Sequence, residues 1–223
     1  MTHTHEAHGD DAVRWSAEFW DERYASKPSL WSGRPNAAMV EEVTPLTPGR
    51  ALDVGCGEGG DAIWLARQGW EVTGADVSQV ALDRAAGEAA REGLTERTRW
   101  ERRDLMTWAP TPASYDLVTV GFFQLPGADR RRVYPVLAEA VAVGGTFLVI
   151  AHDFSDVAVV PRPPEPDLFF TAADLLPDLP GGATAWQVHV ATSRARTQTH
   201  PGTGEPVTVH DAVLRAERMA RER

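Results

Sequence analysis

The chain has 223 residues, of which 43% are hydrophobic, and its formal net charge at pH 7 is −10. This length and composition are typical of one globular domain with a substantial core. The negative charge disfavours a nucleic acid or an anionic membrane surface as the partner. There is no run of 18 apolar residues, no signal-peptide pattern and only one cysteine, Cys56. We therefore expect a cytoplasmic protein with no membrane contact and no disulfide framework.

The first 48 residues are predicted to form a tail and then a helical lid. Residues 1–14 are polar and rich in histidine, which is typical of a disordered tail, and residues 15–223 are predicted to be a single domain. Ser16 precedes a run with helical spacing that ends near Ala25, and a loop rich in Gly and Pro follows over 28–36. A second helix starts near Asn36 and stops before Pro45. We expect this segment, 15–48, to cover a ligand cleft.

Strand and helix patterns alternate through the middle of the chain, 49–152. Strands are predicted near 50–54, 70–75, 98–102, 116–120 and 146–151, and helices near 60–68, 78–92 and 129–142. Alternation of this kind indicates βαβ units and a mostly parallel sheet with helices on both faces, an α/β fold. The remainder, 153–223, contains a proline-rich loop, a short helix after Thr171 and two alternating runs, 186–194 and 206–216. These runs are predicted to be an antiparallel strand pair at one sheet edge.

A glycine-rich turn follows the first strand of this core. Gly55, Gly57 and Gly60 satisfy the dinucleotide pattern G-x-G-x-x-G, and Asp76 lies about 20 residues on, where a ribose-binding acid is expected. The same stretch also reads D-x-G-x-G-x-G, beginning at Asp53. A carboxylate there suits a cofactor with positive charge and suits a pyrophosphate poorly, because like charges repel in a partly dehydrated cleft.

In this second form the stretch resembles motif I of the class I S-adenosylmethionine (SAM)-dependent methyltransferases. Two further stretches agree with that family: the strand that ends at Asp76 and the segment that ends in Asp104-Leu105. The resemblance implies that Asp76 takes the ribose hydroxyls of SAM, and that Asp104 and Leu105 hold its adenine. It also implies a Rossmann-like, seven-stranded sheet whose seventh strand inserts antiparallel between the fifth and sixth. The predicted cofactor-binding residues are Asp53, Gly55, Cys56, Gly57, Gly59, Asp61, Asp76, Val77, Asp104, Leu105 and Gly121.

Within that superfamily, the chain resembles the small-molecule methyltransferases of the tellurite-resistance type and the related thiopurine and thiol methyltransferases. The residues that carry this resemblance lie at 19–24, 51–61, 144–146, 168–171 and 209–216. The group implies direct in-line methyl transfer from SAM to a soft heteroatom (sulfur, selenium or tellurium), with S-adenosylhomocysteine (SAH) as the product. Such acceptors are nucleophilic near neutral pH and need little help from the protein.

A phenol or alcohol acceptor would need a base, and His152 is the candidate. It follows the fifth strand at the edge of the sheet where ligands bind, and a neutral imidazole could accept a proton near pH 7. The alternative is a histidine that is simply hydrogen-bonded at a strand end. The candidate acceptor-binding residues are Trp20, Tyr24, Trp31, Phe122, Phe123 and Arg162. No group of residues has convincing metal-ligand spacing, and no metal site is predicted.

Three other functions remain open from the sequence: O- or N-methylation of a natural product, an NAD-linked oxidoreductase, and SAM binding without catalysis. The oxidoreductase is disfavoured because only about 70 residues follow the fifth strand, which leaves little room for a separate substrate domain. The expected partner is a small-molecule acceptor, and the expected state is a monomer or a weak homodimer.

Overall fold

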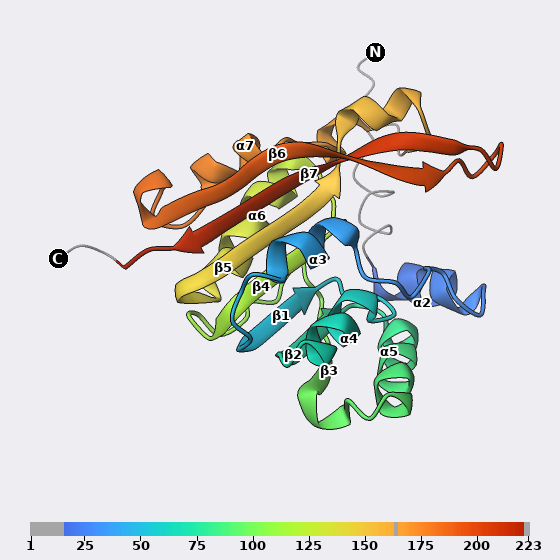
Figure 1. Ribbon diagram of the computed structural model, residues 1–223, viewed down its shortest axis with the longest axis horizontal. Coiled ribbons are helices and arrows are strands. Elements are labelled where there is room, and N and C mark those ends of the chain that lie inside the picture. The colour runs from blue at the N-terminus through green and yellow to red at the C-terminus, as the bar shows by residue number, and fades with distance from the viewer. Residues whose placement is uncertain (1–15, 163–164, 221–223) are drawn as a thin grey trace, which may run out of the picture.

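The computed structural model describes residues 16–162 and 165–220, and they form one seven-stranded sheet with helices on both faces (Figure 1). The predicted tail, 1–14, lies outside the described residues. The strand order is β3-β2-β1-β4-β5-β7-β6. β7 runs antiparallel to both β5 and β6, while the five preceding strands pair in parallel. This confirms the predicted fold class.

The helices and strands follow the predicted order. The strands are β1 (Arg50–Val54), β2 (Glu71–Asp76), β3 (Thr98–Arg102), β4 (Tyr115–Gly121), β5 (Val141–His152), β6 (Trp186–Thr199) and β7 (Pro206–Arg218). The α-helices are α2 (Ala17–Ala25), α3 (Ala37–Val43), α4 (Gly60–Arg67), α5 (Gln79–Arg91), α6 (Gly127–Glu139) and α7 (Ala172–Leu175). Short 3-10 helices include η2 (Phe154–Ala158) and η3 (Pro166–Leu168). The caps were readable from the sequence, because Ser16, Asn36 and Ser78 each accept a hydrogen bond from the first turn of the helix that follows.

The two C-terminal strands are longer than predicted. The prediction ended the first at Arg194 and the second at Ala216, whereas β6 continues to Thr199 and β7 to Arg218. Beyond Arg194 the only apolar residue of β6 is Ala195, so no apolar alternation marks this end of the strand. This extension matters, because it carries Arg196 to the end of the sheet where the pocket lies.

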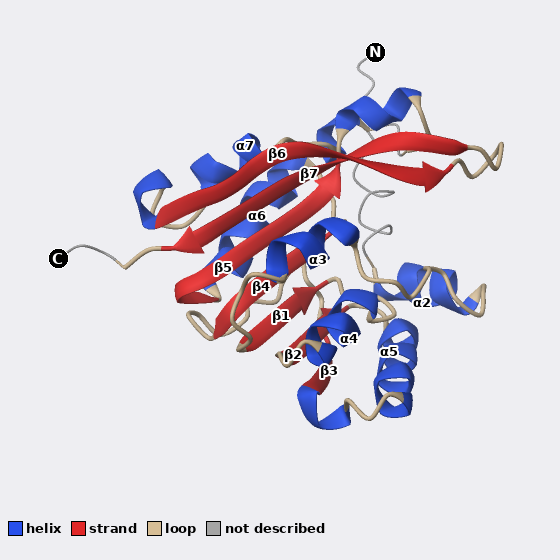
Figure 2. Cartoon of the chain, in the orientation of Figure 1, coloured by secondary structure: helices blue, strands red, loops and turns tan. Residues whose placement is uncertain are grey.

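Alternate residues of the central strands build two cores. On one face, Leu52 and Val118 pack with α6 residues such as Leu137, and on the other, Ala51 and Leu117 pack with residues of α3 and α4. Figure 2 shows α3 and α4 in front of the sheet and α6 behind it. The sheet is therefore covered on both sides, and its open edge for ligands is the row of carboxyl strand ends. No helix among the described residues has the length and apolar character needed to cross a membrane.

Candidate active site

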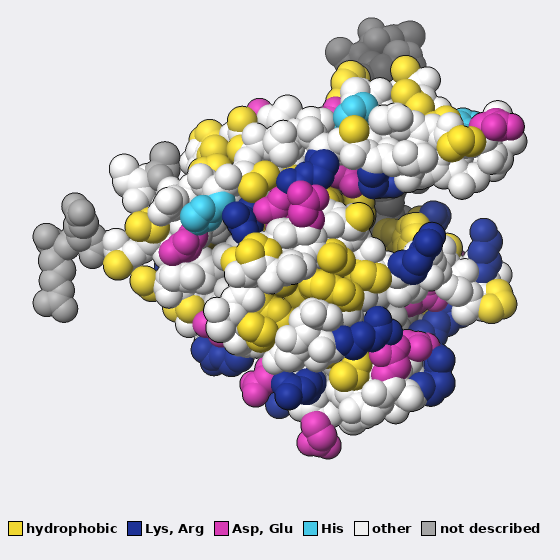
Figure 3. Space-filling model, in the orientation of Figure 1, with side chains coloured by type: hydrophobic (Ala, Val, Ile, Leu, Met, Phe, Trp, Pro, Cys, Tyr) yellow, Lys and Arg dark blue, Asp and Glu magenta, His cyan; other side chains and the backbone are white. Residues whose placement is uncertain are grey.

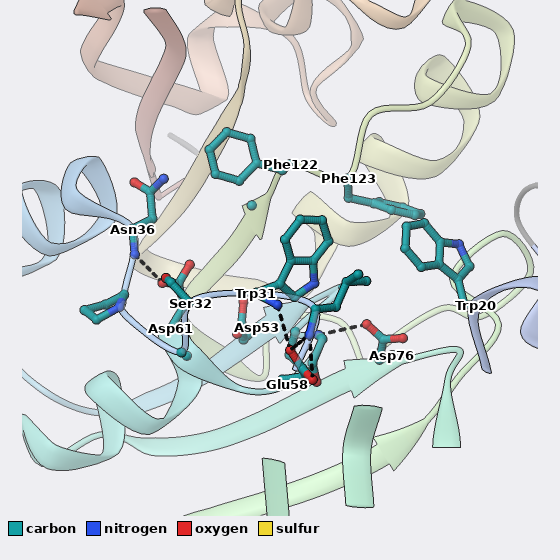
Figure 4. Close-up of a pocket in the computed structure, with 18 of the residues that line it drawn as sticks. Trp20, Trp31, Ser32, Asn36, Asp53, Glu58, Asp61, Asp76, Phe122 and Phe123 are labelled. Atoms are coloured by element: carbon teal, nitrogen blue, oxygen red, sulfur yellow. Dashed lines mark hydrogen bonds between the residues drawn. The ribbon is translucent and has the colours of Figure 1, made fainter. Parts of the chain in front are cut away.

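A cavity of about 900 Å³ opens at the carboxyl ends of β1, β2 and β4, beneath α2 and the loop that follows it (Figure 4). It brings together nearly all of the predicted site residues. The lining includes Trp20, Tyr24, Trp31, Asp53, Gly55, Cys56, Gly57, Asp61, Asp76, Val77, Asp104, Leu105, Gly121, Phe122, Phe123, His152 and Arg162. In Figure 4 the rings of Trp31, Phe122 and Phe123 lie above the carboxylates of Asp53, Glu58 and Asp76. The cavity therefore has an acidic floor and aromatic walls.

Asp76 holds the glycine loop in place. Its carboxylate accepts hydrogen bonds from the backbone N–H of Gly57 at 2.9 Å and from that of Ser78 at 2.9 Å. Gly57 has φ +52°, and a Cβ there would lie 2.8 Å from the hydroxyl oxygen of Tyr24. Glycine is required at this position both by the backbone conformation and by the close approach of the helix above. Asp76 thus links the end of β2 to the loop after β1.

Gly59, the remaining predicted cofactor contact, does not line the cavity. It has φ +82° and precedes α4, and a Cβ there would lie 2.8 Å from Cβ of Ala85 and 2.9 Å from the ring of Trp100. The requirement for glycine therefore comes from packing between α5, β3 and the loop. Sequence spacing cannot separate this role from ligand contact, because both call for the same residue.

Two carboxyls at the cavity floor, the buried Asp53 and the half-buried Asp61, are poised to hold a cation. Asp53 is 3% exposed, and its Oδ2 has no hydrogen-bond partner among the described residues. Burial, reinforced by the nearby carboxyls of Asp61 and Asp76, raises the pKa of Asp53 well above its usual range. Burial also raises the pKa of Asp61 to about 6, although its Oδ1 accepts the N–H of Asn36 at 2.6 Å. An unpartnered buried acid beside a second one fits an ammonium or sulfonium group and does not fit a pyrophosphate.

Other predicted cofactor residues have local structural roles as well. The carboxylate of Asp104 accepts hydrogen bonds from the N–H of Met106 at 2.9 Å and the hydroxyl of Thr107 at 3.0 Å, which fixes the turn after β3. Leu105 is buried and presents an apolar surface to the cavity. Burial raises the pKa of the Cys56 thiol well above its usual range, so the thiol is a packing group and a poor nucleophile.

Sequence reasoning missed the residue that fastens the N-terminal segment over the cavity. The carboxylate of Glu58 accepts the N–H groups of Leu30 and Trp31, each at 3.0 Å, and pairs with Arg84 at 2.7 Å. Arg84 also donates to the backbone carbonyls of Tyr24 and Lys27. Although burial works in the other direction, hydrogen bonds from Trp31 and Arg84 hold the pKa of Glu58 below its usual value. Glu58 lies in the glycine loop, so it joins the loop directly to the lid.

The opposite end of the cavity is built around Phe122 and His152. Phe122 has φ +54°, a strained conformation for a bulky residue that is found at functional sites. Its ring lies 4.4 Å from that of His152 between centroids. Burial, together with the charges of Arg162 and Arg196, lowers the pKa of His152 to about 3, so the ring is neutral at pH 7.

The ring nitrogens of His152 are both occupied or covered. Nε2 lies 3.2 Å from Nη1 of Arg162, which can only donate, so Nε2 is the acceptor and the proton of the neutral ring is on Nδ1. Nδ1 is buried without a partner among the described residues. This arrangement leaves no free lone pair for a proton from an acceptor, which argues against the predicted role of His152 as a base.

Comparison with known proteins agrees with this geometry. Residues 51–145 match a family model described as "Methyltransferase domain". This central part of the chain is therefore similar to a methyltransferase domain. This similarity and the unpartnered carboxylate oxygen of Asp53 favour SAM over NAD as the cofactor.

Three curated relatives show how much of the chain is shared. The chain is 30% identical over 146 residues to methyltransferase GfsG of Streptomyces halstedii, a match that covers 63% of the chain and 52% of the relative. It is 36% identical over 102 residues to ribosomal RNA small subunit methyltransferase C of Alcanivorax borkumensis, covering 45% and 29%. It is 27% identical over 135 residues to 2-heptyl-1-hydroxyquinolin-4(1H)-one methyltransferase of Mycobacteroides abscessus, covering 59% of each. Each match spans less than two thirds of the relative.

A solved structure shares the fold over almost the whole chain. The structure titled "Conversion of a Disulfide Bond into a Thioacetal Group during Echinomycin Biosynthesis" superimposes with a TM-score of 0.73 and 24% identity, covering 92% of this chain and 93% of the other. The likeness therefore extends well beyond the residues, 51–145, that match the methyltransferase model. Among the described residues no group of three or more His, Cys, Asp or Glu is placed to hold a metal.

The acidic floor of the cavity predicts cofactor binding that depends on pH. SAH and SAM carry an ammonium group, which the ionised carboxyls of Asp53 and Asp61 would hold. We expect the affinity for SAH to fall roughly fivefold from pH 6 to pH 5, because protonation of Asp61, with its pKa of about 6, removes that charge. Binding near pH 6 should release protons, which calorimetry in two buffers of different ionisation enthalpy measures. Affinity that stays constant between pH 5 and pH 7.5 would contradict this account, and Asp61→Asn is the control that should lose the dependence.

Loosening the lid should weaken SAM binding without unfolding the domain. In Glu58→Gln the pair with Arg84 is lost and the N–H groups of Leu30 and Trp31 share one carbonyl oxygen in place of a carboxylate. We expect the affinity for SAH to fall about tenfold, and amide hydrogen exchange over 26–36 to speed up. Glu41→Gln, on the exposed side of α3, is the matched control and should change neither quantity. Unchanged exchange over 26–36 in the Glu58 variant would show that the lid is held by other contacts.

Proposed function

We propose that this protein transfers the methyl group of SAM to a soft nucleophilic atom, most simply the sulfur of a thiol, on a small molecule. The observation that carries the proposal is the lack of a usable base among the described residues of the acceptor end. His152 is neutral, and its accessible lone pair is taken by Arg162. Arg196 is a cation, and the side-chain oxygen of Gln198 accepts a hydrogen bond from it.

Because no protein group there removes a proton, an acceptor must already be ionised or must be nucleophilic in its neutral form. A thiol loses its proton to solvent near neutral pH, whereas a phenol or an alcohol needs a base beside it. SAM supplies a methyl group on a positively charged sulfur, so a thiolate lone pair forms the new C–S bond and the electrons of the broken bond remain on the sulfur of SAH. The chain contributes alignment and the exclusion of water by the lid.

A small acceptor is favoured over a nucleic acid by charge and by the shape of the site. The net charge is −10, and on the face drawn in Figure 3 basic and acidic side chains are interspersed without a basic stripe. The same view shows the surface hollowed between the β6–β7 hairpin and α2. A cavity closed by α2 and its loop suits a compact substrate, while RNA recognition requires an extended basic surface.

The test is a measurement of SAH formation from SAM with three matched acceptors: an aryl thiol, the corresponding phenol and the corresponding aniline. We expect turnover with the thiol and at least 100-fold less with the other two. Equal or greater turnover of the phenol would overturn the proposal in favour of O-methylation. Tight SAH binding with no turnover of any acceptor would instead indicate a protein that binds SAM without catalysis.

A further inference from the structure

Two guanidinium groups from distant parts of the chain lie at the acceptor end of the cavity. Arg162 follows η2, and Arg196 lies on the extended end of β6. Their side chains are 11% and 28% exposed, so both are largely withdrawn from solvent. Removing a charge from water is costly unless the charge is paired. Two largely buried cations beside a ligand cavity therefore indicate a function in ligand binding.

Each guanidinium is held from behind by a buried carboxylate. Nη2 of Arg162 lies 3.3 Å from Oδ2 of Asp156, and Nε of Arg196 donates to Oδ2 of Asp211 at 2.7 Å. Asp156 also accepts the backbone N–H of His210, which fixes it between η2 and β7. These anchors orient the arginines and leave other N–H groups unused. Nη2 of Arg196 has no partner among the described residues, and a guanidinium carries five donors.

Phe122 and His152 shape the surface between the two arginines. The guanidinium carbon of Arg196 lies 6.0 Å from the ring centroid of Phe122, whose other neighbour is the ring of His152. His152 accepts a hydrogen bond from Arg162 and carries no charge of its own. It is therefore a positioning residue for Arg162. The result is a flat apolar surface beside two oriented cations.

The two ends of the cavity thus have opposite electrostatic character. Asp53, Asp61 and Asp76 surround the SAM end, and Arg162 and Arg196 lie at the other end beside His152 and Phe122. We propose that the methyl acceptor is an organic anion, a thiol whose flat apolar skeleton also carries a carboxylate, and that Arg196 and Arg162 bind this carboxylate. Planar guanidinium groups match carboxylates in geometry and charge, and Phe122 supplies the apolar contact. The inference rests on the proposed function, because it names the acceptor for the same site.

The matched probes are 3-mercaptobenzoate and 3-mercaptobenzamide, which differ in charge but hardly in shape. With the wild-type protein we expect kcat/KM to favour the carboxylate about 30-fold, mainly through KM. In Arg196→Gln the preference should fall to about threefold or less, while the affinity for SAH stays the same. Equal kcat/KM values for the two wild-type reactions, or a preference that survives the substitution, would overturn the inference. So would a methyl ester as the product, because the carboxylate would then be the reacting group.

Two further variants keep the test clear. Arg196→Gln leaves Asp211 buried without its ion pair, so Arg196→Gln/Asp211→Asn removes both charges and restores a neutral hydrogen-bonded pair. The double variant should also lose the preference. Arg194→Gln is the control, because Arg194 lies on the same strand but pairs with Glu41 and Glu42 outside the cavity. It should retain the wild-type preference.

Binding to the SAH complex separates failure of this inference from failure of the proposed function. If neither thiol is methylated but 3-mercaptobenzoate binds the wild-type SAH complex at least tenfold more tightly than the amide, the anion subsite stands and the proposed reaction fails. If both thiols are methylated equally, the reaction stands and the subsite fails. Binding of tellurite and selenite to the SAH complex is measured in the same way. If these oxyanions bind and the organic carboxylate does not, the ligand is not an organic acid and the inference is contradicted.

Discussion

Replacing Asp76 by Ala should lower the affinity of the protein for SAH by about 100-fold. The carboxylate accepts the N–H groups of Gly57 and Ser78, so its loss leaves two buried donors without partners and frees the glycine loop. The same change removes the acid to which the resemblance to SAM-dependent methyltransferases assigns the ribose hydroxyls. Calorimetric titration of SAH into wild type and variant measures the effect.

Asp104→Ala is the comparison for Asp76→Ala. Both acids follow a strand and line the cavity, but Asp104 is exposed and its two oxygens are engaged in its own turn. We expect its replacement to cost about tenfold or less in SAH affinity. Equal losses in the two variants would show that Asp76 has no special part in fixing the loop. A folded Asp76 variant with wild-type affinity would remove the residue from the cofactor site.

Gly59→Ala should lower the free energy of unfolding by about 2–4 kcal/mol, because the new Cβ meets Ala85 and Trp100 while the backbone is held at φ +82°. Urea denaturation monitored by circular dichroism gives the value. The fraction that remains folded should bind SAH within about threefold of wild type, since Gly59 does not line the cavity. A stable variant with lost SAH binding would return Gly59 to the cofactor contacts.

Gly87 provides the opposite control for Gly59. It lies on the exposed side of α5 with ordinary helical φ, and a Cβ there would touch nothing within 4 Å. Gly87→Ala should therefore raise the free energy of unfolding by about 0.5–1 kcal/mol, because alanine loses less backbone entropy in a helix. The two variants test whether local geometry, and not the residue type, decides if a Gly→Ala substitution raises or lowers the free energy of unfolding.

The sequence predicted the sheet and the cofactor end of the cavity because local chemistry determines both. Apolar strands bounded by glycine and capped helices need no tertiary information, and acids such as Asp53 and Asp76 follow directly at strand ends. Where one residue serves two roles the prediction became ambiguous. Gly59 is the example, since a packing glycine and a ligand-contacting glycine look the same in the sequence.

The acceptor end could not be predicted because its parts meet only in the folded chain. Arg196 lies on a strand that was expected to end at Arg194, and its partner Asp211 comes from the neighbouring strand. Glu58 lies within the glycine-rich motif, but its role depends on the backbone of Leu30 and Trp31, which lie 28 and 27 residues earlier. His152 was placed correctly in the cavity, and only its hydrogen bond with Arg162 reveals that its lone pair is occupied.

The most direct test of the proposed mechanism is the pH dependence of kcat/KM for methyl transfer to a series of thiols of different pKa, using the wild-type protein above pH 7. Without a protein base, the rising limb of each profile should have its midpoint at the pKa of the thiol itself and move with it along the series. A midpoint that is the same for every thiol would contradict the account, because it would report a group of the protein that removes the proton.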